Sequence, residues 1–298
     1  MPNSPKTRFT GHGFLAIDKP AGKTSAQVIQ PFKRLCSGKV GHVGTLDPFA
    51  TGLLVLAIGH ATKFAQYQLE ARKTYQACIQ LGKKTDTQDK TGTILDSQAI
   101  PSLSEKQIQR AIKQKFIGEI TQVAPKFSAL KHEGKPRYHY ARKGIEIPDK
   151  VRTQIIYAVD NIIYNQSNGQ IQCCICCNGG TYIRALAESI AEELNCIGYL
   201  ESLHRVSVAC WENDVLHSPD SCSLENLEHR VQPIDKILQH IQAITLDVES
   251  ITLLQHGQTI PSPVNTNESL FRIYSPDKIF FGLAMCHNNM FKARKILQ

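Results

Sequence analysis

The chain has 298 residues, of which 42% are hydrophobic, and its 34 Lys and Arg exceed its 26 Asp and Glu to give a formal net charge of +8. This length suggests one large domain or two, and the composition is ordinary for a soluble globular protein. No apolar run approaches the roughly 20 residues of a membrane span, and residues 1–6 lack the apolar region of a signal peptide, so we expect a cytoplasmic protein. The moderate basic excess hints at a polyanionic partner.

A short apolar strand is predicted at residues 13–17, which read Gly-Phe-Leu-Ala-Ile. The sequence Gly22-Lys23-Thr24 follows and matches the end of a P-loop. A P-loop also needs a glycine five residues before Gly22, and position 17 is Ile, so the turn that cradles phosphate is missing. We therefore reject a nucleotide-binding P-loop.

A helix is expected next, with Ser25 as its N-cap. Apolar residues recur at helical spacing on one of its faces, at Val28, Ile29, Phe32 and Leu35. Pro31 lies inside the same segment, where its ring and missing N–H should kink the helix.

The stretch of residues 41–52, Gly-His-Val-Gly-Thr-Leu-Asp-Pro-Phe-Ala-Thr-Gly, predicts a loop with unusual backbone demands. Residues 53–59 behind it form an apolar run that is typical of a fully buried strand. Asp47 is the only acidic residue between Asp18 and Glu70. A loop anchored on a buried strand can hold one side chain in a fixed pose, although local chemistry alone also allows Asp47 simply to cap its own backbone in a tight turn.

A helix over residues 62–70 and a half-buried strand over 73–81 are predicted after this loop. The strand alternates so that one face carries Tyr75, Ala77, Ile79 and Leu81. Residues 84–92 are polar and predict a loop. Ser102 and Glu105 then show capping-box spacing and open a further helix, whose apolar residues at four-residue intervals are Ile108, Ile112 and Phe116.

Positive charge is concentrated in residues 124–152. From Lys126 to Arg152 there are eight Lys and Arg but three Asp and Glu, so more than half of the net charge lies in 27 residues. Phe127, Tyr138 and Tyr140 are interleaved with these basic residues. Such a segment suits a nucleic-acid surface, with charge for phosphates and rings for stacking, although a solvated basic loop has a similar composition.

Ten cysteines raise the question of disulfides or a metal site. The run Cys173-Cys174-Ile175-Cys176-Cys177 contains two overlapping C-x-x-C spacings, but it continues a β-like segment. Alternation would then divide the four sulfurs between the two faces of a strand, and no second C-x-x-C or closely spaced Cys/His pair completes a site. We expect free, mostly buried thiols in a reducing compartment.

An amphipathic helix is predicted from Thr181 onward, with an apolar face made of Ile183, Leu186, Ala187, Ile190, Ala191 and Leu194. A polar connection follows over residues 211–242, with a helix near 233–240. The last fifty residues predict a short apolar helix that ends at His256-Gly257 and three strands, at 269–274, 279–285 and 290–297. So few small strands bury little surface by themselves and should pack on the main domain.

The 41–52 stretch resembles the catalytic-loop motif of the TruB family of tRNA pseudouridine synthases, which is close to G-H-x-G-T-L-D-P-x-A-T-G, and ten motif positions match. The order of the basic segment resembles the P-x-F-S-A-L-K segment of that family and the Y…A-R-x-G that follows it. Residues 198–205 resemble its leucine-arginine motif, except that His204 replaces the usual basic residue. The resemblance spans roughly residues 11–298.

The resemblance implies an α+β fold with a mixed, mainly antiparallel sheet. It also implies a catalytic domain at residues 1–244, with its RNA-binding segment at about 124–152, and a PUA-like RNA-binding domain at 245–298. The partner would be the T-stem-loop of tRNA, modified at position 55. No cofactor, metal, membrane or protein partner is expected, and we expect a monomer.

The resemblance also implies roles for individual residues. Asp47 would be the catalytic carboxylate, Arg184 the arginine that pairs with it, and Tyr75 the tyrosine that stacks on the target base. His42 would stack in the RNA near the flipped nucleotide. The remaining residues expected to contact substrate are Tyr182 and Leu203, which would line the uridine pocket, and Lys19, which would contact a phosphate.

Several alternatives stay open at the level of sequence. The carboxylate can attack C1′ or assist formation of a glycal, or it can add to C6 of the pyrimidine ring. One rival function is an inactive homologue that folds tRNA without modifying it, although it would not need Asp47, Tyr75 and Arg184 together. Another is a carboxylate-dependent glycosidase, which usually needs a pair of carboxylates, and no acidic partner accompanies Asp47 locally.

Overall fold

The structure is a computed structural model that describes residues 8–211, 216–264, 266 and 269–297. Residues 1–6, on which the expectation of no signal peptide rests, lie outside the described residues, as does part of the polar connection after Trp211. Among the helices of the described ranges, none is both long and apolar enough to cross a membrane.

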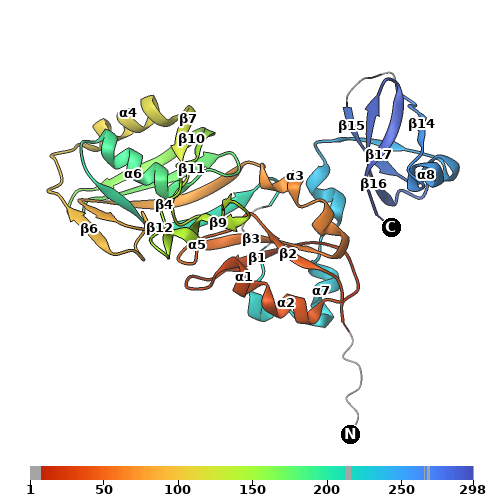
Figure 1. The fold of residues 1–298 in the computed structure, drawn as a ribbon, viewed down its shortest axis with the longest axis horizontal. Coiled ribbons are helices and arrows are strands. Elements are labelled where there is room, and N and C mark those ends of the chain that lie inside the picture. Colours follow the sequence, from red (N-terminus) through yellow and green to blue (C-terminus); the bar gives the residue numbers. More distant parts are fainter. Residues whose placement is uncertain (1–7, 212–215, 265, 267–268, 298) are drawn as a thin grey trace, which may run out of the picture.

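A twisted eight-stranded sheet forms the centre of the molecule (Figure 1). Its strand order is β1-β3-β12-β4-β11-β10-β7, with β2 also paired to β3. All of these pairs are antiparallel except β12 with β3, which confirms the predicted mixed, mainly antiparallel sheet. The strands are β1 (Gly13–Lys19), β2 (Val40–Val43), β3 (Thr51–Ile58), β4 (Lys73–Leu81), β7 (Gly118–Val123), β10 (Val151–Asn165), β11 (Gln170–Cys177) and β12 (Gly198–Val208).

Two amphipathic helices, α4 (Glu105–Phe116) and α6 (Ile183–Glu193), cover one face of this sheet and share a single apolar core with it. The predicted apolar faces of both helices are confirmed, since Ile112 and Ile190 are fully buried. The predicted capping box of α4 is wrong. Ser104 is the N-cap and forms the box with Gln107, because the helix begins at Glu105.

The first helix is broken in two, as α1 (Ser25–Val28) and α2 (Gln30–Leu35). Pro31 lies in the first turn of α2, where a missing N–H is harmless, so the predicted kink takes the form of a break at Ile29. The prediction that Ser25 is the N-cap is wrong, because Thr24 caps α1 and forms a capping box with Gln27.

Other short segments differ from expectation. The helix predicted at 62–70 is a 3₁₀ turn, η1 (Gly59–Lys63), followed by α3 (Gln66–Leu69), and the one near 233–240 is a 3₁₀ turn, η4 (Ile234–Leu238). Helix α7 (Leu224–Arg230) and the 3₁₀ turn η3 (Pro219–Ser221) were not predicted. Periodicity over four or five residues is too short to distinguish these geometries.

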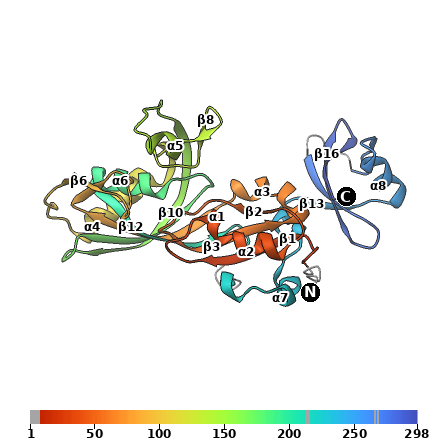
Figure 2. The same ribbon diagram turned by 60° about the horizontal axis from the view of Figure 1, so that its bottom comes forward.

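Loops predicted from polarity also contain strands. The polar loop at 84–92 is flanked by β5 (Lys83–Thr85) and β6 (Ile94–Ser97), which form a hairpin. The start of the 41–52 stretch is part of β2, so His42 lies on a strand. The basic segment contains β8 (Lys131–His132), β9 (Lys135–Pro136) and α5 (Arg137–Ala141), and it projects above the sheet (Figure 2).

The cysteine-rich run lies on β11 and alternates as predicted. Cys173 and Cys177 are buried on the core face, whereas Cys174 and Cys176 are half-buried. All ten cysteines of the chain are free thiols, and six of them are buried.

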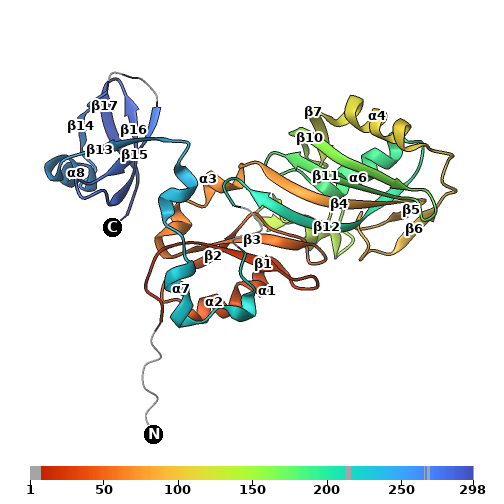
Figure 3. The same ribbon diagram turned by 180° about the vertical axis from the view of Figure 1, so that it is seen from behind.

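The C-terminal strands form a separate five-stranded sheet beside the central one, which is clear from both sides of the molecule (Figure 3). Its order is β13-β15-β16-β17-β14, and its own apolar core is completed by helix α8 (Val248–Gln255). Leu283 and Phe280 pack with Phe64 of the main domain, as expected for a sheet too small to stand alone. The strands are β13 (Gln242–Thr245), β14 (Thr259–Pro261), β15 (Ser269–Tyr274), β16 (Phe280–His287) and β17 (Met290–Ile296). The second sheet therefore begins at Gln242, and a domain division at residue 244 stays a prediction.

Candidate active site

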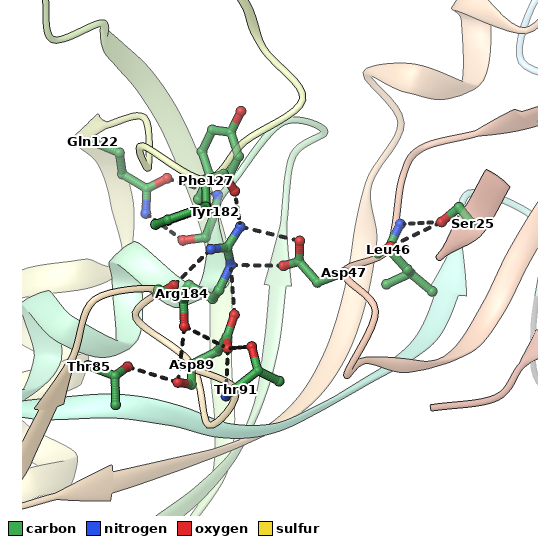
Figure 4. Close-up of polar contacts among 11 residues, drawn as sticks. Ser25, Leu46, Asp47, Thr85, Asp89, Thr91, Gln122, Phe127, Tyr182 and Arg184 are labelled. Carbon is green, nitrogen blue, oxygen red and sulfur yellow. Dashed lines mark hydrogen bonds and ion pairs between the residues drawn. The ribbon is translucent and has the colours of Figure 1, made fainter. Parts of the chain in front are cut away.

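Asp47, in the middle of the β2–β3 loop, forms a two-point ion pair with Arg184 (Figure 4). Arg184 Nε donates to Asp47 Oδ2 at 2.9 Å, and Nη2 donates to Oδ1 at 3.2 Å. The arginine side chain is 4% exposed and the aspartate side chain 32% exposed. A planar guanidinium bound at two points fixes both the position and the rotation of a carboxylate, while one side of Asp47 stays accessible.

Arg184 is held in turn by groups from two other segments. Its Nη1 donates to the carbonyl of Thr87 at 2.8 Å, and its Nη2 also donates to the carbonyl of Phe127 at 2.9 Å. The second contact connects the basic segment directly to the arginine. Because α6 places Arg184 in its first turn, where a cation is disfavoured by the helix dipole, these acceptors and Asp47 offset an otherwise poor position.

A second carboxylate, Asp89, lies 3.7 Å from Arg184 Nε and was not expected from the sequence. Asp89 is 4% exposed, and its Oδ1 accepts from the Thr91 N–H and from the Thr87 hydroxyl, both at 2.9 Å. The available signal was an aspartate surrounded by threonines in a polar loop, which is typical of a carboxylate that bonds its own turn. The sequence contained no sign that this loop reaches Arg184.

The Asp47 loop is fixed at both ends. The Ser25 hydroxyl donates to the Leu46 carbonyl at 3.1 Å and accepts from the Leu46 N–H at 3.0 Å. On the other side, Lys19 Nζ donates to the carbonyls of Pro48 at 3.1 Å and Ala50 at 2.6 Å. Both ends of the loop are therefore attached to elements that precede it in the sequence.

The structure places Lys19, which was expected to contact a phosphate, inside the protein. Its side chain is fully buried, and its third N–H bonds the Pro20 carbonyl at 2.9 Å, so no donor is left for substrate. Burial lowers the pKa of Lys19 to about 8, against the opposing effect of Asp47. Lys19 instead positions the backbone on which Asp47 stands.

A cavity of about 850 Å³ opens in front of the ion pair. Its lining includes Asp47 and Arg184 together with three further predicted site residues, Tyr75, Tyr182 and Leu203. Tyr182 is fixed through its backbone, since Gln122 bonds both its N–H at 3.1 Å and its carbonyl at 3.2 Å. Five of the seven expected residues therefore meet around one cavity.

Tyr75 is buried within this wall, at 6% exposure. Burial raises the pKa of its hydroxyl, while the nearby charge of Arg205 opposes the rise. The group is therefore a neutral phenol at neutral pH, and its ring is available as an apolar surface beside the carboxylate.

His42, like Lys19, is a predicted residue that is not part of the cavity lining. It is half-buried on β2, where it pairs with Leu56 of β3. Burial, followed by the charges of Arg205 and Lys33, lowers the pKa of its imidazole. A neutral ring near the loop fits stacking better than ion pairing, so the role of His42 in the RNA stays a prediction.

Two further buried cations line the cavity, Lys73 on β4 and Arg205 on β12. Neither was expected as a site residue, although Arg205 ends the leucine-arginine motif. Lys73 precedes Tyr75 by two residues, so strand alternation places both on the same face of β4. That period-2 relation was the signal in the sequence from which Lys73 could have been found.

No cluster of three or more His, Cys, Asp or Glu side chains is arranged to hold a metal ion in the ranges that the structure describes. Asp47 and Asp89 are instead engaged with Arg184.

Comparison with known protein families identifies both parts of the chain. Residues 33–183 match the model of the TruB family pseudouridylate synthase N-terminal domain, and residues 243–296 match that of the pseudouridine synthase II TruB C-terminal domain. The chain is similar to the tRNA pseudouridine synthase B of Marinomonas sp. (strain MWYL1), with 39% identity over 91% of this chain and 90% of that protein. It is equally similar, at 39% identity, to that of Hydrogenovibrio crunogenus, over 91% of this chain and 88% of that protein.

Solved structures share the fold at low sequence identity. An H/ACA RNP bound to a substrate RNA containing 2′-deoxyuridine superposes with a TM-score of 0.71 at 19% identity, over 96% of this chain and 85% of that one. A Cbf5-Nop10-Gar1 complex gives 0.70 at 21% identity, over 96% and 84%. Both likenesses extend over nearly the whole chain and confirm the predicted fold class.

Proposed function

This chain belongs to the TruB family of pseudouridine synthases, and on that premise we propose that it isomerises uridine to pseudouridine in tRNA, at position 55 of the T-stem-loop. The observation that carries the proposal is the two-point pair of Asp47 and Arg184 at the wall of a cavity of about 850 Å³. This space accommodates a nucleotide that has been rotated out of the RNA, which costs a few kcal/mol of stacking.

The isomerisation breaks the N1–C1′ bond, rotates the uracil and rejoins it through C5, so no atom is gained or lost. In the proposed reaction Asp47 attacks C1′ or assists glycal formation, or it adds to C6. Either route needs an ionised carboxylate whose lone pairs point at the sugar or the ring. Arg184 orients Asp47, and the side of the carboxylate away from Arg184 faces the cavity.

The remaining cavity residues are assigned to binding the uridine. The Tyr75 ring stacks on the target base, and its neutral hydroxyl is a candidate for proton transfer at C5. Tyr182 and Leu203 provide the other apolar surfaces of the pocket. His42, outside the cavity, is assigned to the neighbouring RNA, where it stacks in the space that the target nucleotide leaves.

The basic segment and the C-terminal domain are assigned to tRNA binding. The segment carries most of the net charge, and its Phe127 carbonyl bonds Arg184, so RNA held by the segment is brought to the catalytic pair. We place the division between catalytic and PUA-like domains at about residue 244 and expect a cytoplasmic monomer.

The proposal is tested with unmodified tRNA transcript labelled with tritium at C5 of uridine. Wild-type protein should release tritium at one T-loop uridine, and Asp47→Asn should reduce the rate by more than about 10³-fold because the nucleophile is lost. Asp18→Asn, at an exposed position on β1, is the matched control and should keep full activity.

Three other outcomes would each contradict part of the proposed function. Binding of tRNA without tritium release by the wild type would support a non-catalytic RNA-binding homologue. Release of free uracil would indicate a glycosidase. Equal release by Asp47→Asn would contradict the assigned role of Asp47.

A further inference from the structure

Buried cations outnumber buried carboxylates around the cavity. Lys19, Lys73, Arg184 and Arg205 are each at most 4% exposed. Arg184 lies within 4.0 Å of the carboxylates of Asp47 and Asp89. No ion pair within that distance involves the other three cations in the described parts of the chain. Burying a charge without a partner is costly, so these three cations need another source of compensation.

Lys19 is accounted for, because three carbonyl oxygens accept its three N–H groups and it does not line the cavity. Lys73 and Arg205 are different. Lys73 Nζ donates to the carbonyls of Leu69 at 2.8 Å and Ala71 at 3.0 Å, which leaves one of its three donors.

Arg205 is also held by backbone carbonyls, and its side chain hydrogen-bonds the buried Tyr75. Its Nε donates to Leu53 at 2.7 Å and its Nη2 to Gly44 at 2.9 Å. A guanidinium has five N–H donors, so these bonds fix its orientation and do not exhaust it. Both cations are therefore held rigidly, and both keep hydrogen-bonding capacity beside the cavity.

The two cations meet at Gly44, which has a φ of +73°. A Cβ at this position would lie 3.5 Å from Arg205 Nη1 and 3.5 Å from Lys73 Cε, so the two side chains converge on one point of the cavity wall. Glu70 is the other carboxylate in the lining, but it is exposed and forms no ion pair with Lys73 among the described contacts. An anion that enters the cavity would supply the negative charge that Lys73 and Arg205 lack as a partner.

We propose that Lys73 and Arg205 bind a backbone phosphodiester adjacent to the target uridine. The inference rests on the proposed function, because an RNA nucleotide brings a phosphate on each side of the base. Lys provides a point charge and Arg a planar fork, the two forms in which proteins hold phosphate. A phosphate fixed here sets the register of the nucleotide, so that C1′ meets Asp47 rather than a neighbouring atom.

The test uses synthetic T-stem-loops in which one linkage, 5′ or 3′ of the target uridine, is an uncharged methylphosphonate. For the wild type, kcat/KM should fall about tenfold or more at one linkage and change little at the other, because a charged hydrogen bond to phosphate is lost. Lys73→Met should show the same loss on unmodified RNA and no further loss at that linkage. Lys113→Met, on the exposed face of α4, is the control and should behave as the wild type does.

Other results would overturn the inference. These are equal activity of the wild type on all three RNAs, or a methylphosphonate effect that adds in full to that of Lys73→Met. Competition by inorganic phosphate with no linkage effect would assign the pair to free phosphate instead. If Lys73→Met does not fold, the comparison of the three RNAs with the wild type decides whether a phosphate is bound. Lys73→Arg, which keeps the charge, should then remain sensitive to the same methylphosphonate linkage as the wild type. Absence of pseudouridine in unmodified RNA would instead overturn the proposed function itself.

Discussion

The cavity has two cationic sides that differ in how their charge is balanced. On one, Arg184 is paired with Asp47 and Asp89 and bonded to two carbonyls. On the other, Lys73 and Arg205 have carbonyl partners and no carboxylate among the described ion pairs. Both sides are buried to a similar degree, so burial does not explain the difference.

The contrast separates two requirements of catalysis on RNA. A charge that must have a fixed orientation before substrate arrives is paired within the protein, which removes reorganisation during the reaction. A cation that recognises substrate must have no carboxylate partner in the free protein, so that a phosphate of the substrate can pair with it. Geometry should therefore dominate at Arg184, and charge should dominate at Lys73.

The largest effect is expected for Arg184→Lys. Lysine keeps the charge but loses the two-point contact with Asp47, so kcat should fall about 10²-fold or more with tRNA affinity nearly unchanged. Single-turnover tritium release together with filter binding separates the two quantities. If Lys at this position retained more than half of the activity, the side chain would act through its charge alone.

A change in the backbone of β3 beside Arg205 should destabilise the whole fold and not one side of the cavity alone. Gly52 has a φ of +94°, and a Cβ there would lie 2.4 Å from the Arg205 carbonyl oxygen, so Gly52→Ala should destabilise the fold by about 2 kcal/mol or more. Urea unfolding measures this loss. Gly41→Ala, where a Cβ meets nothing within 4 Å and φ is not positive, is the control and should be close to neutral.

Asp89→Asn tests the contact between Arg184 and its second carboxylate partner. The amide keeps the shape but removes the charge that faces Arg184, so we expect about a tenfold loss in kcat, ~1.4 kcal/mol, with little change in KM. Asp96→Asn, on exposed strand β6, is the control. A change confined to KM would show that Asp89 acts on RNA binding instead.

The smallest expected effect is a pH dependence of KM that arises from Lys73, on the side of the cavity without a carboxylate partner. Burial, and then the charge of Arg205, lowers the pKa of Lys73 to about 8. As pH rises from 7 to 9 the free protein loses this charge, so KM for the T-stem-loop should rise severalfold in the wild type. The rise should be absent in Lys73→Arg, which stays charged. An identical pH profile in both proteins would exclude Lys73 as the titrating group.

The lowered pKa of Lys73 affects the stability of the fold in the opposite direction to its effect on substrate binding. The folded pKa of Lys73 lies below its unfolded value near 10.5, so the unfolded chain binds more protons between about pH 8 and pH 10. This group therefore stabilises the fold as pH rises through that window, while substrate binding weakens. Lys19 shifts in the same direction and contributes to stability but not to KM, since it does not line the cavity.

Much of the fold and part of the site followed from the sequence by itself. The periods of 2 and 3.6 residues identified strand β4, the apolar face of α6 and the alternation of the Cys173–Cys177 run. The contiguous motif around Asp47 identified the family, and with it the pairing of Asp47 with Arg184. These features depend on neighbours along the chain, where a pattern in the residues is sufficient.

Only the tertiary structure decided which charges are paired. Asp89 reaches Arg184 because the β5–β6 hairpin folds against the start of α6, and Lys19 is enclosed by carbonyls of a loop some thirty residues later. Asp47 itself lies 137 positions from its arginine. The strength of a charge interaction depends on distance and burial in space, and neither is encoded in the spacing of the residues along the chain.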